Sequence, residues 1–173
     1  MEKHKVCSFF GHRNIETTEK LKSLLKSVIT NLIEYEKVEV FLFGSRSNFD
    51  SLCHAVVTQL RETYPHIQRR AYTCRSETCI LETERAYWEK IYSHFEKCPV
   101  TLLGVEEEIE YKAKYEAGRA SYVERNQAMI NDSDFCVFYY NKEYVPTTKT
   151  NSGTKIAYEY ALRKKKTVIN LFN

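Results

Sequence analysis

Three short segments of this sequence combine glycine with hydroxyl or cationic side chains, the groups that bind phosphate in proteins. They are Gly11-His12-Arg13, Gly44-Ser45-Arg46 and Ser152-Gly153-Thr154. Glycine lets a ligand approach the backbone closely, and backbone amides, hydroxyls and guanidinium groups all donate hydrogen bonds to phosphate oxygens. We therefore expect the three segments to form an anion-binding site. The alternative, that each glycine only allows a tight turn, is left open by the sequence.

Each of these segments stands where a strand or loop is expected to pass into a helix. Apolar runs predict strands at 5–10, 38–43, 68–74, 134–140 and 167–172. Apolar residues at helical spacing predict helices at 21–33, 49–60, 82–95, 120–131 and 153–165. Residues 100–105 are expected to form a short strand or an extended loop.

The alternation of strands and helices predicts an α/β fold. We expect a Rossmann-like three-layer sandwich, with a mainly parallel sheet and helices on both faces, formed by residues 1–173 as a single domain. In open parallel sheets, ligands bind outside the carboxyl ends of the strands. The three glycine segments should therefore converge on one cleft.

The composition excludes several classes of protein. With 43% hydrophobic and 28% charged residues, the chain has the usage of an ordinary globular domain. No apolar run approaches the roughly 20 residues of a spanning helix, and no secretory signal is evident, so we expect a cytoplasmic protein without a membrane partner. The net charge is only +3, and no element carries a stripe of basic and aromatic residues, which argues against a nucleic acid partner.

The six cysteines do not suggest a disulfide framework or a metal site. Cys7, Cys53 and Cys136 lie at apolar positions of expected strands and helices, where a free cysteine behaves as a small hydrophobic residue. Cys74 and Cys79 lack the second pair of ligands that a zinc site needs. The sequence also has no Walker loop and no GxGxxG segment, so we expect neither a metal nor a cofactor.

The middle of the chain is rich in aromatic residues that look exposed. They are Tyr87, Trp88, Tyr92, Tyr111 and Tyr115. Such a cluster favours self-association, and a homo-oligomer is one expectation for this protein.

The glycine segments, together with three later motifs, resemble a bacterial branch of the SLOG superfamily. The motifs are Phe10-Gly11-His12-Arg13, Phe43-Gly44-Ser45-Arg46, the run Arg125-Asn126-Gln127-Ala128-Met129, Ser133-Asp134 before a strand, and Ser152-Gly153-Thr154 with Tyr158-Glu159-Tyr160-Ala161 behind it. The resemblance covers about the first 60 and the last 55 residues. That superfamily includes the DNA-processing protein Smf and the Lonely Guy phosphoribohydrolases.

The resemblance implies a Rossmann-like sheet whose ligand, a nucleotide or a nucleotide-derived phosphate, lies over the turn at Gly153 and Thr154. Lonely Guy enzymes use an arginine and a glutamate to cleave the N-glycosidic bond of a nucleoside monophosphate. Arg125 matches the arginine, with Asn126 in the position of the motif's lysine. The position of the glutamate, three residues after Thr154, is occupied here by Ala157.

Whether the protein is an enzyme is therefore undecided at this point, and the catalytic candidates are Glu159, Asp50 and Arg125. Glu159 lies two residues beyond Ala157, about 200° further round the helix. Asp50 either caps a helix that begins after Ser47 or binds a ribose hydroxyl. His12 either acts as an acid or base near neutral pH or donates a hydrogen bond.

We expect a protein that binds a nucleotide-type small molecule. The first alternative is a phosphoribohydrolase, an N-glycosidase of the Lonely Guy type that acts on nucleoside 5'-monophosphates. The second is a DNA-associated or protein-interaction module, which the resemblance to Smf suggests.

Overall fold

The computed structural model describes residues 3–44, 47–74, 86, 104–111, 114, 118–146 and 152–172. Six parallel strands form one sheet in the order β4-β3-β2-β1-β5-β6. The strands are β1 (Lys5–Gly11), β2 (Val38–Phe43), β3 (Gln68–Thr73), β4 (Glu107–Glu110), β5 (Phe135–Tyr139) and β6 (Thr167–Asn170). The fold is α/β and Rossmann-like, as the alternation of strands and helices predicts.

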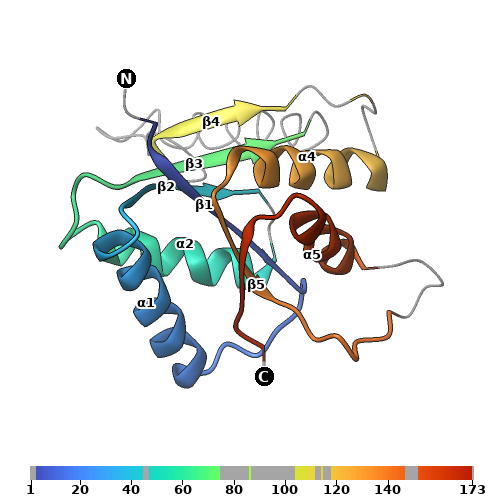
Figure 1. Cartoon of the computed structure of the whole chain (residues 1–173), viewed down its shortest axis with the longest axis horizontal. Helices are drawn as coiled ribbons and strands as arrows, with labels where there is room; N and C mark the ends of the chain where they lie inside the picture. The colour runs from blue at the N-terminus through green and yellow to red at the C-terminus, as the bar shows by residue number, and fades with distance from the viewer. Residues whose placement is uncertain are drawn as a thin grey trace.

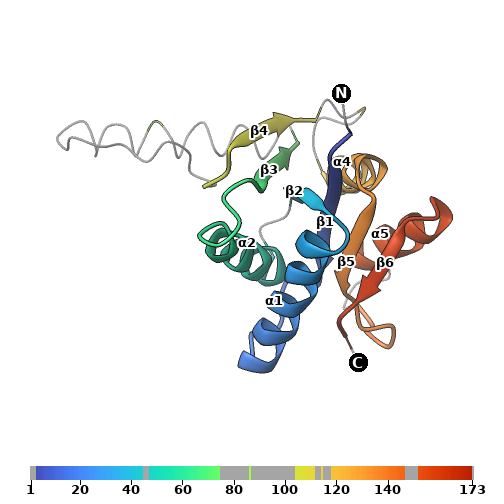
Figure 2. The same cartoon turned by 60° about the vertical axis from the view of Figure 1, so that its left-hand side comes forward.

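The helices cover both faces of this sheet (Figures 1 and 2). They are α1 (Glu19–Glu34), α2 (Asn48–Leu60), α4 (Arg119–Asp132) and α5 (Gly153–Arg163). One core lies between the sheet and the pair α1 and α2, and a second lies between the sheet and the pair α4 and α5. The described part of the chain thus forms the three layers that the sequence predicts.

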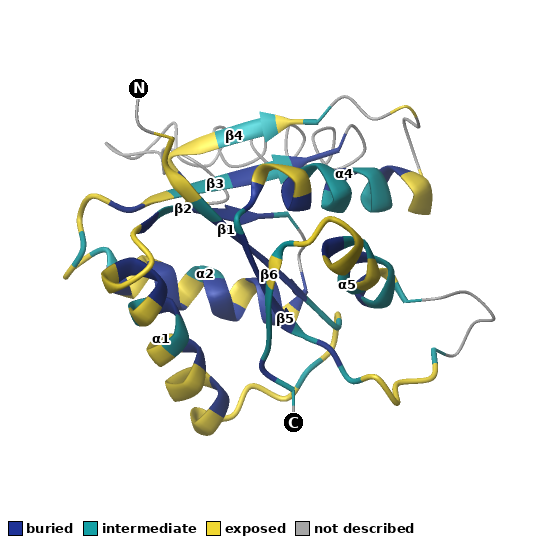
Figure 3. Ribbon diagram, viewed as in Figure 1, coloured by how far each residue is buried: buried dark blue, intermediate teal, exposed yellow. Residues whose placement is uncertain are grey.

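The central strands β1, β2 and β5 are buried over most of their length because helices cover both faces (Figure 3). Strands in such a position are apolar at successive residues rather than at alternate ones. The ring of Phe9 stacks on those of Phe41 and Phe43, with centroids 6.0 and 5.4 Å apart. This continuous apolarity makes these strands recognisable in the sequence.

Three helices begin at hydroxyl side chains that accept a hydrogen bond from the first turn. Thr18 Oγ1 accepts from the Leu21 amide at 3.1 Å, Ser47 Oγ from Asp50 at 3.1 Å, and Ser152 Oγ from Lys155 at 3.0 Å. These bonds satisfy amides that have no acceptor within the helix. The cap at Ser47 confirms the expected start of α2.

Strand β4 departs from the sequence prediction. The sequence predicts a strand or loop at 100–105, but β4 begins only at Glu107. Gly104 and Val105 lie outside any strand, and residues 100–103 lie outside the described ranges. β4 has the sequence Glu-Glu-Ile-Glu, which shows no apolar pattern, and it pairs with β3 at the edge of the sheet. Arg70 Nε lies 3.0 Å from Glu107 Oε2 across the β3–β4 pair.

The order of the strands changes direction between β1 and β5. The chain moves outward through β2, β3 and β4 and then returns to the other side of β1. Asp134 fixes this return, because its amide donates to the Val6 carbonyl at 2.8 Å and its carboxylate accepts from the Val6 amide at 3.0 Å. The carboxyl ends of β1 and β5 therefore border a topological switch point, the place where ligands bind in open α/β sheets.

Several expectations concern residues whose structure is not described. The helix expected at 82–95 lies outside the described residues except for Ala86. Of the aromatic residues in the middle of the chain, only Tyr111 is described, and it is partly buried; Tyr87, Trp88, Tyr92 and Tyr115 are not. Residues 147–151 of the polar loop after β5 are also outside the described ranges.

Cys7, Cys53, Cys74 and Cys136 are buried and form no disulfide, so those at apolar positions do pack as small hydrophobic residues. Burial raises the pKa of Cys136 to about 11, which keeps its thiol protonated. None of the helices in the described part of the chain combines the length and the apolarity that crossing a membrane requires. Within the same ranges, no three His, Cys, Asp or Glu side chains are grouped as a metal site would need.

Candidate functional site

A cavity of about 670 Å³ lies at the carboxyl edge of the sheet. Residues from the turn after β1, the start of α2, the middle of α4, the loop after β5 and the start of α5 line it. They are Phe10, Gly11, His12, Arg13, Asn14, Ser47, Tyr122, Arg125, Asn126, Tyr144, Ser152, Gly153 and Thr154. The first and third glycine segments, far apart in the sequence, therefore converge as expected.

The turn after β1 is held against the start of α2. The Asn48 amide donates to the Arg13 carbonyl at 2.9 Å. A Cβ added at Gly11 would lie 2.5 Å from the ring of Phe49 and 2.6 Å from its Cβ. Glycine is therefore required at this position for α2 to pack across the end of β1. The sequence suggests that Gly11 allows a ligand to approach the backbone, whereas the structure shows that it allows Phe49 to pack there.

The amino end of α5 faces the cavity. Ser152 Oγ accepts from Lys155, which leaves Gly153 and Thr154 as the first-turn amides without an acceptor in the helix. A Cβ added at Gly153 would meet no heavy atom within 4 Å. The space beside Gly153 is therefore open to a ligand, and the partial positive charge of the helix end favours an anion there.

Arg125 brings a buried cation to the cavity wall. Arg125 is only 2% exposed. Its guanidinium carbon lies 5.5 Å from the ring centroid of Tyr122, and its Nε donates to Asn126 Oδ1 at 3.2 Å. Tyr122 precedes Arg125 by one helical turn, so the two side chains share a face of α4. The ring and the amide hold the guanidinium in place before any ligand arrives.

Gly44 contributes to the site through packing. It is not among the described residues that line the cavity, but a Cβ there would clash with Met129 Sδ and lie 3.2 Å from Arg125 Nε. Gly44 therefore lets α4 bring Arg125 over the end of β2. Ser45 and Arg46, the other members of this segment, lie outside the described residues.

His12 lies beside the loop after β5. The Asn141 amide donates to its Nε2 at 3.0 Å, so the ring accepts a hydrogen bond here and does not donate one. An imidazole that accepts through Nε2 is neutral and carries its proton on Nδ1. Partial burial lowers the pKa of His12 below its usual value, which is consistent with the neutral ring.

A family model matches nearly the whole chain. The model of the YspA SLOG family covers residues 4–172. The chain belongs to this family. The match includes the middle of the sequence, for which the motifs alone show no counterpart, and it confirms the resemblance to the SLOG superfamily. No curated protein matches the sequence.

The acidic candidates lie away from the described wall of the cavity. Neither Glu159 nor Asp50 is among the described residues that line the cavity. The Glu159 carboxylate lies 3.9 Å from Lys155 Nζ on the outer face of α5 and is half exposed. Asp50 is buried in the first turn of α2 beside the Ser47 cap. Ala157 lies in the core under α5.

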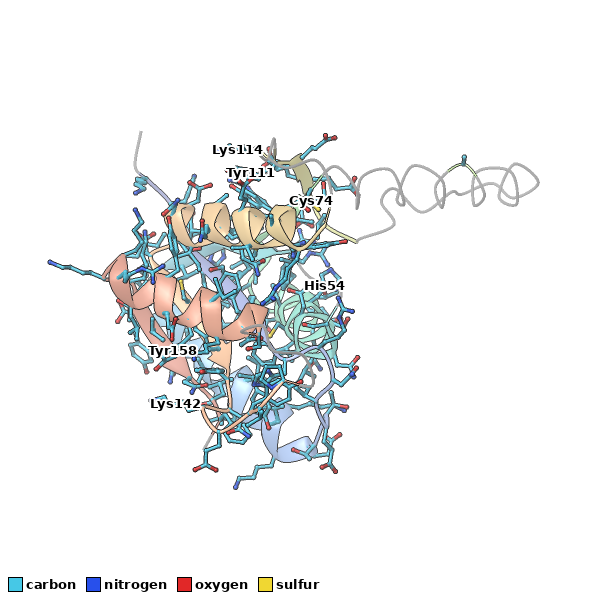
Figure 4. The ribbon with its side chains drawn as sticks, turned by 90° about the vertical axis from the view of Figure 1, so that its right-hand side faces the viewer. His54, Cys74, Tyr111, Lys114, Lys142 and Tyr158 are labelled. Carbon is cyan, nitrogen blue, oxygen red and sulfur yellow. The ribbon has the colours of Figure 1, made fainter. Side chains whose placement is uncertain are left out.

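Sequence reasoning missed two aromatic residues in the site of this SLOG protein. Tyr122 lies three residues before Arg125, and that spacing on a helix would have signalled it. Tyr144 lies in the polar loop after β5 (the loop that carries Lys142 near Tyr158 in Figure 4), and nothing in the local pattern marks it. A lone tyrosine in a loop has no periodicity from which a role can be inferred.

Proposed function

We propose that this chain binds a nucleotide or a nucleotide-derived phosphate ligand at the carboxyl ends of its parallel strands. The proposal is carried by one observation. The open amino end of α5 and the buried Arg125 meet in a cavity at the switch point between β1 and β5, and the described lining contains no carboxylate.

The chemistry of the lining supports an anionic ligand. Arg125 and Arg13 supply cations, and the Gly153 and Thr154 amides supply donors along a helix axis. Charge-assisted hydrogen bonds from such groups are the strong interactions that phosphate makes with proteins. The described wall therefore offers a phosphate both positive charge and hydrogen-bond donors.

The size of the cavity supports a small molecule. A volume of about 670 Å³ lies within the range of pockets that enclose a ligand as large as a drug or a mononucleotide. The aromatic rings of Tyr122, Tyr144 and His12 add apolar surface to the wall. A ligand with both a phosphate and a planar ring system suits this combination.

A thermal-shift series tests the proposal. AMP, GMP, ribose 5-phosphate and inorganic phosphate are compared with adenosine, which lacks the charge. A ligand at 100 times its dissociation constant should stabilise the fold by about 2.7 kcal/mol, which for a chain of this size raises the melting temperature by about 5–10 °C. We expect the phosphorylated compounds to raise the melting temperature and adenosine to raise it only slightly.

Two results would contradict the proposal. The first is a melting temperature that none of the phosphorylated compounds changes. The second is a larger stabilisation by a single-stranded oligonucleotide than by any mononucleotide, which would favour the DNA-associated alternative.

A further inference from the structure

A ladder of aromatic rings connects the core under α5 to the wall of the cavity. Tyr158 meets the buried ring of Phe138 edge-on with centroids 5.2 Å apart, and its centroid lies 4.9 Å from that of Tyr140. The ring of His12 continues the ladder, 5.8 Å from Tyr140 and 4.5 Å from Tyr144. Tyr144 is the last ring, and it lines the cavity.

Tyr144 is held in position although it is exposed. Its amide donates to the Asn141 carbonyl at 3.1 Å, and the Glu143 amide donates to Asn141 Oδ1 at 2.9 Å, which closes a tight turn. The Asn141 amide in turn donates to His12 Nε2. One chain of contacts therefore joins the end of β1 to the turn that carries the tyrosine.

The ring of Tyr144 is only partly covered by its contact with His12. The residue is 47% exposed, so one part of the ring packs on His12 and the rest faces solvent at the cavity. A rigid aromatic face that is only partly covered binds another planar ring with little loss of side-chain freedom. Neutral His12 behind it adds no charge that would favour phosphate at this position.

We propose that Tyr144, supported by His12, is the platform on which the base of the nucleotide stacks. This inference rests on the proposed function and adds the recognition of the base to it. The phosphate would bind at the cations and amides of α4 and α5, and the base at the loops that follow β1 and β5. The ligand class is then a purine or pyrimidine nucleotide, not a sugar phosphate.

Calorimetric titration of two Tyr144 variants with two ligands tests the platform. AMP carries the base, and ribose 5-phosphate lacks it. Tyr144→Leu removes the aromatic face, and Tyr144→Phe keeps it. Loss of a stacked base weakens binding by about 5-fold to 150-fold. We therefore expect Tyr144→Leu to lower the affinity for AMP by such a factor and to leave the affinity for ribose 5-phosphate unchanged. Tyr144→Phe should bind AMP nearly as the unmodified chain does.

Tyr35→Leu is the matched control, because Tyr35 is an exposed tyrosine at the end of α1 and is not part of the cavity wall. It should change neither titration. The platform is wrong if Tyr144→Leu binds AMP as tightly as the unmodified chain, or if it weakens both ligands equally. Binding of ribose 5-phosphate by the unmodified chain would then still support the phosphate site. If neither ligand binds the unmodified chain, the proposed function and the platform both fail.

Discussion

At the scale of single residues, a methyl group has opposite consequences at two glycines of the site. At Gly153 it would meet no heavy atom within 4 Å, whereas at Gly11 it would lie 2.5 Å from the Phe49 ring. The first position is open towards the cavity, and the second is filled by the protein itself. This difference separates a role in ligand binding from a role in packing.

We predict that Gly153→Ala folds normally and loses its ligand. The backbone there does not have the positive φ that disfavours alanine, so replacing glycine should stabilise the chain by about 0.4–1 kcal/mol. The added methyl would occupy space beside the first amides of α5, and the thermal shift with AMP should disappear. Gly11→Ala is the contrast, because overpacking against Phe49 should lower the stability by about 1–3 kcal/mol. A full thermal shift in Gly153→Ala would contradict the proposed phosphate position.

Arg125 provides a second test on a single side chain. Charge-assisted hydrogen bonds contribute about 1.5–3 kcal/mol, so Arg125→Gln should weaken ribose 5-phosphate by about 10-fold to 150-fold in calorimetry. The control is Arg163→Gln, an exposed arginine in the last turn of α5 that stacks on Tyr160. An Arg125→Gln variant that folds and binds as tightly as the control would remove Arg125 from the site.

His12 should make the stability depend on pH. Burial lowers the pKa of its folded-state ring, so below about pH 6.5 the unfolded chain binds a proton that the folded chain does not. The free energy of unfolding should therefore fall as the pH decreases from about 6.5 towards the folded-state pKa. Urea unfolding from pH 7.5 to pH 5 measures this slope. In His12→Phe, which cannot titrate, the slope should be smaller, and an equal slope in both chains would contradict the prediction.

At the scale of elements, the residue just before edge strand β4, Glu106, contacts β3 and the end of α2 through its carboxylate. Glu106 accepts from the Arg69 amide at 2.6 Å and forms ion pairs with Arg69 at 2.6 Å and Arg61 at 2.8 Å. Partial burial would raise the pKa of Glu106, but the hydrogen bonds and charges of Arg69 and Arg61 together hold it below its usual value. The strand is thus attached to β3 and α2 by polar contacts.

We predict that Glu106→Gln destabilises the chain more than Glu107→Gln does. A partly buried donor that loses its acceptor lowers the free energy of unfolding by about 1–3 kcal/mol. Glu107 pairs with Arg70 in a more exposed position, where an ion pair contributes about 0–1 kcal/mol. Chemical denaturation of the two variants compares them directly, and equal losses would show that β4 does not depend on this carboxylate.

At the scale of the whole molecule, the sheet order brings the turn after β1 and the start of α5 together at the switch point between β1 and β5. The cavity there has cations, amides and rings in its described wall but no carboxylate. Cleavage of an N-glycosidic bond develops positive charge on the ribose, and a nearby carboxylate stabilises that charge or activates water. If the cavity binds a nucleotide as proposed, its described wall offers no carboxylate for the Lonely Guy route.

We therefore predict that the protein releases free base from AMP, GMP, CMP or UMP slowly or not at all. A missing catalytic acid or base commonly lowers the rate by about 10²–10⁴-fold. Chromatography of the incubated nucleotides measures the release, with Glu159→Gln and Asp50→Asn as companion variants. Rapid release that either substitution abolishes would establish an N-glycosidase and overturn this prediction.

Much of the fold could be predicted from the sequence because burial within one element leaves a local pattern. Strands β1, β2 and β5 are mostly apolar, helix α1 repeats its leucines and isoleucines at helical spacing, and Ser47 and Ser152 stand at helix starts. The glycine segments at 11–13 and 152–154 could be recognised from the combination of glycine with hydroxyl or cationic side chains. The single-domain organisation and the homo-oligomer remain predictions.

Other features were decided only by the tertiary structure, because contacts between distant segments leave no periodic signal. Gly11 is required by Phe49, and Gly44 by Met129 and Arg125, neighbours that the sequence cannot identify. β4 was missed because its sequence, Glu-Glu-Ile-Glu, has no apolar run, and its pairing with β3 joins residues far apart in the sequence. The hydrogen bond between Asn141 and His12 joins residues 129 positions apart. It positions the turn whose Tyr144 lines the cavity. The sequence alone therefore identified the hydrogen-bond donors of the site. The contact between His12 and Tyr144 forms only because the fold brings the ends of β1 and β5 together.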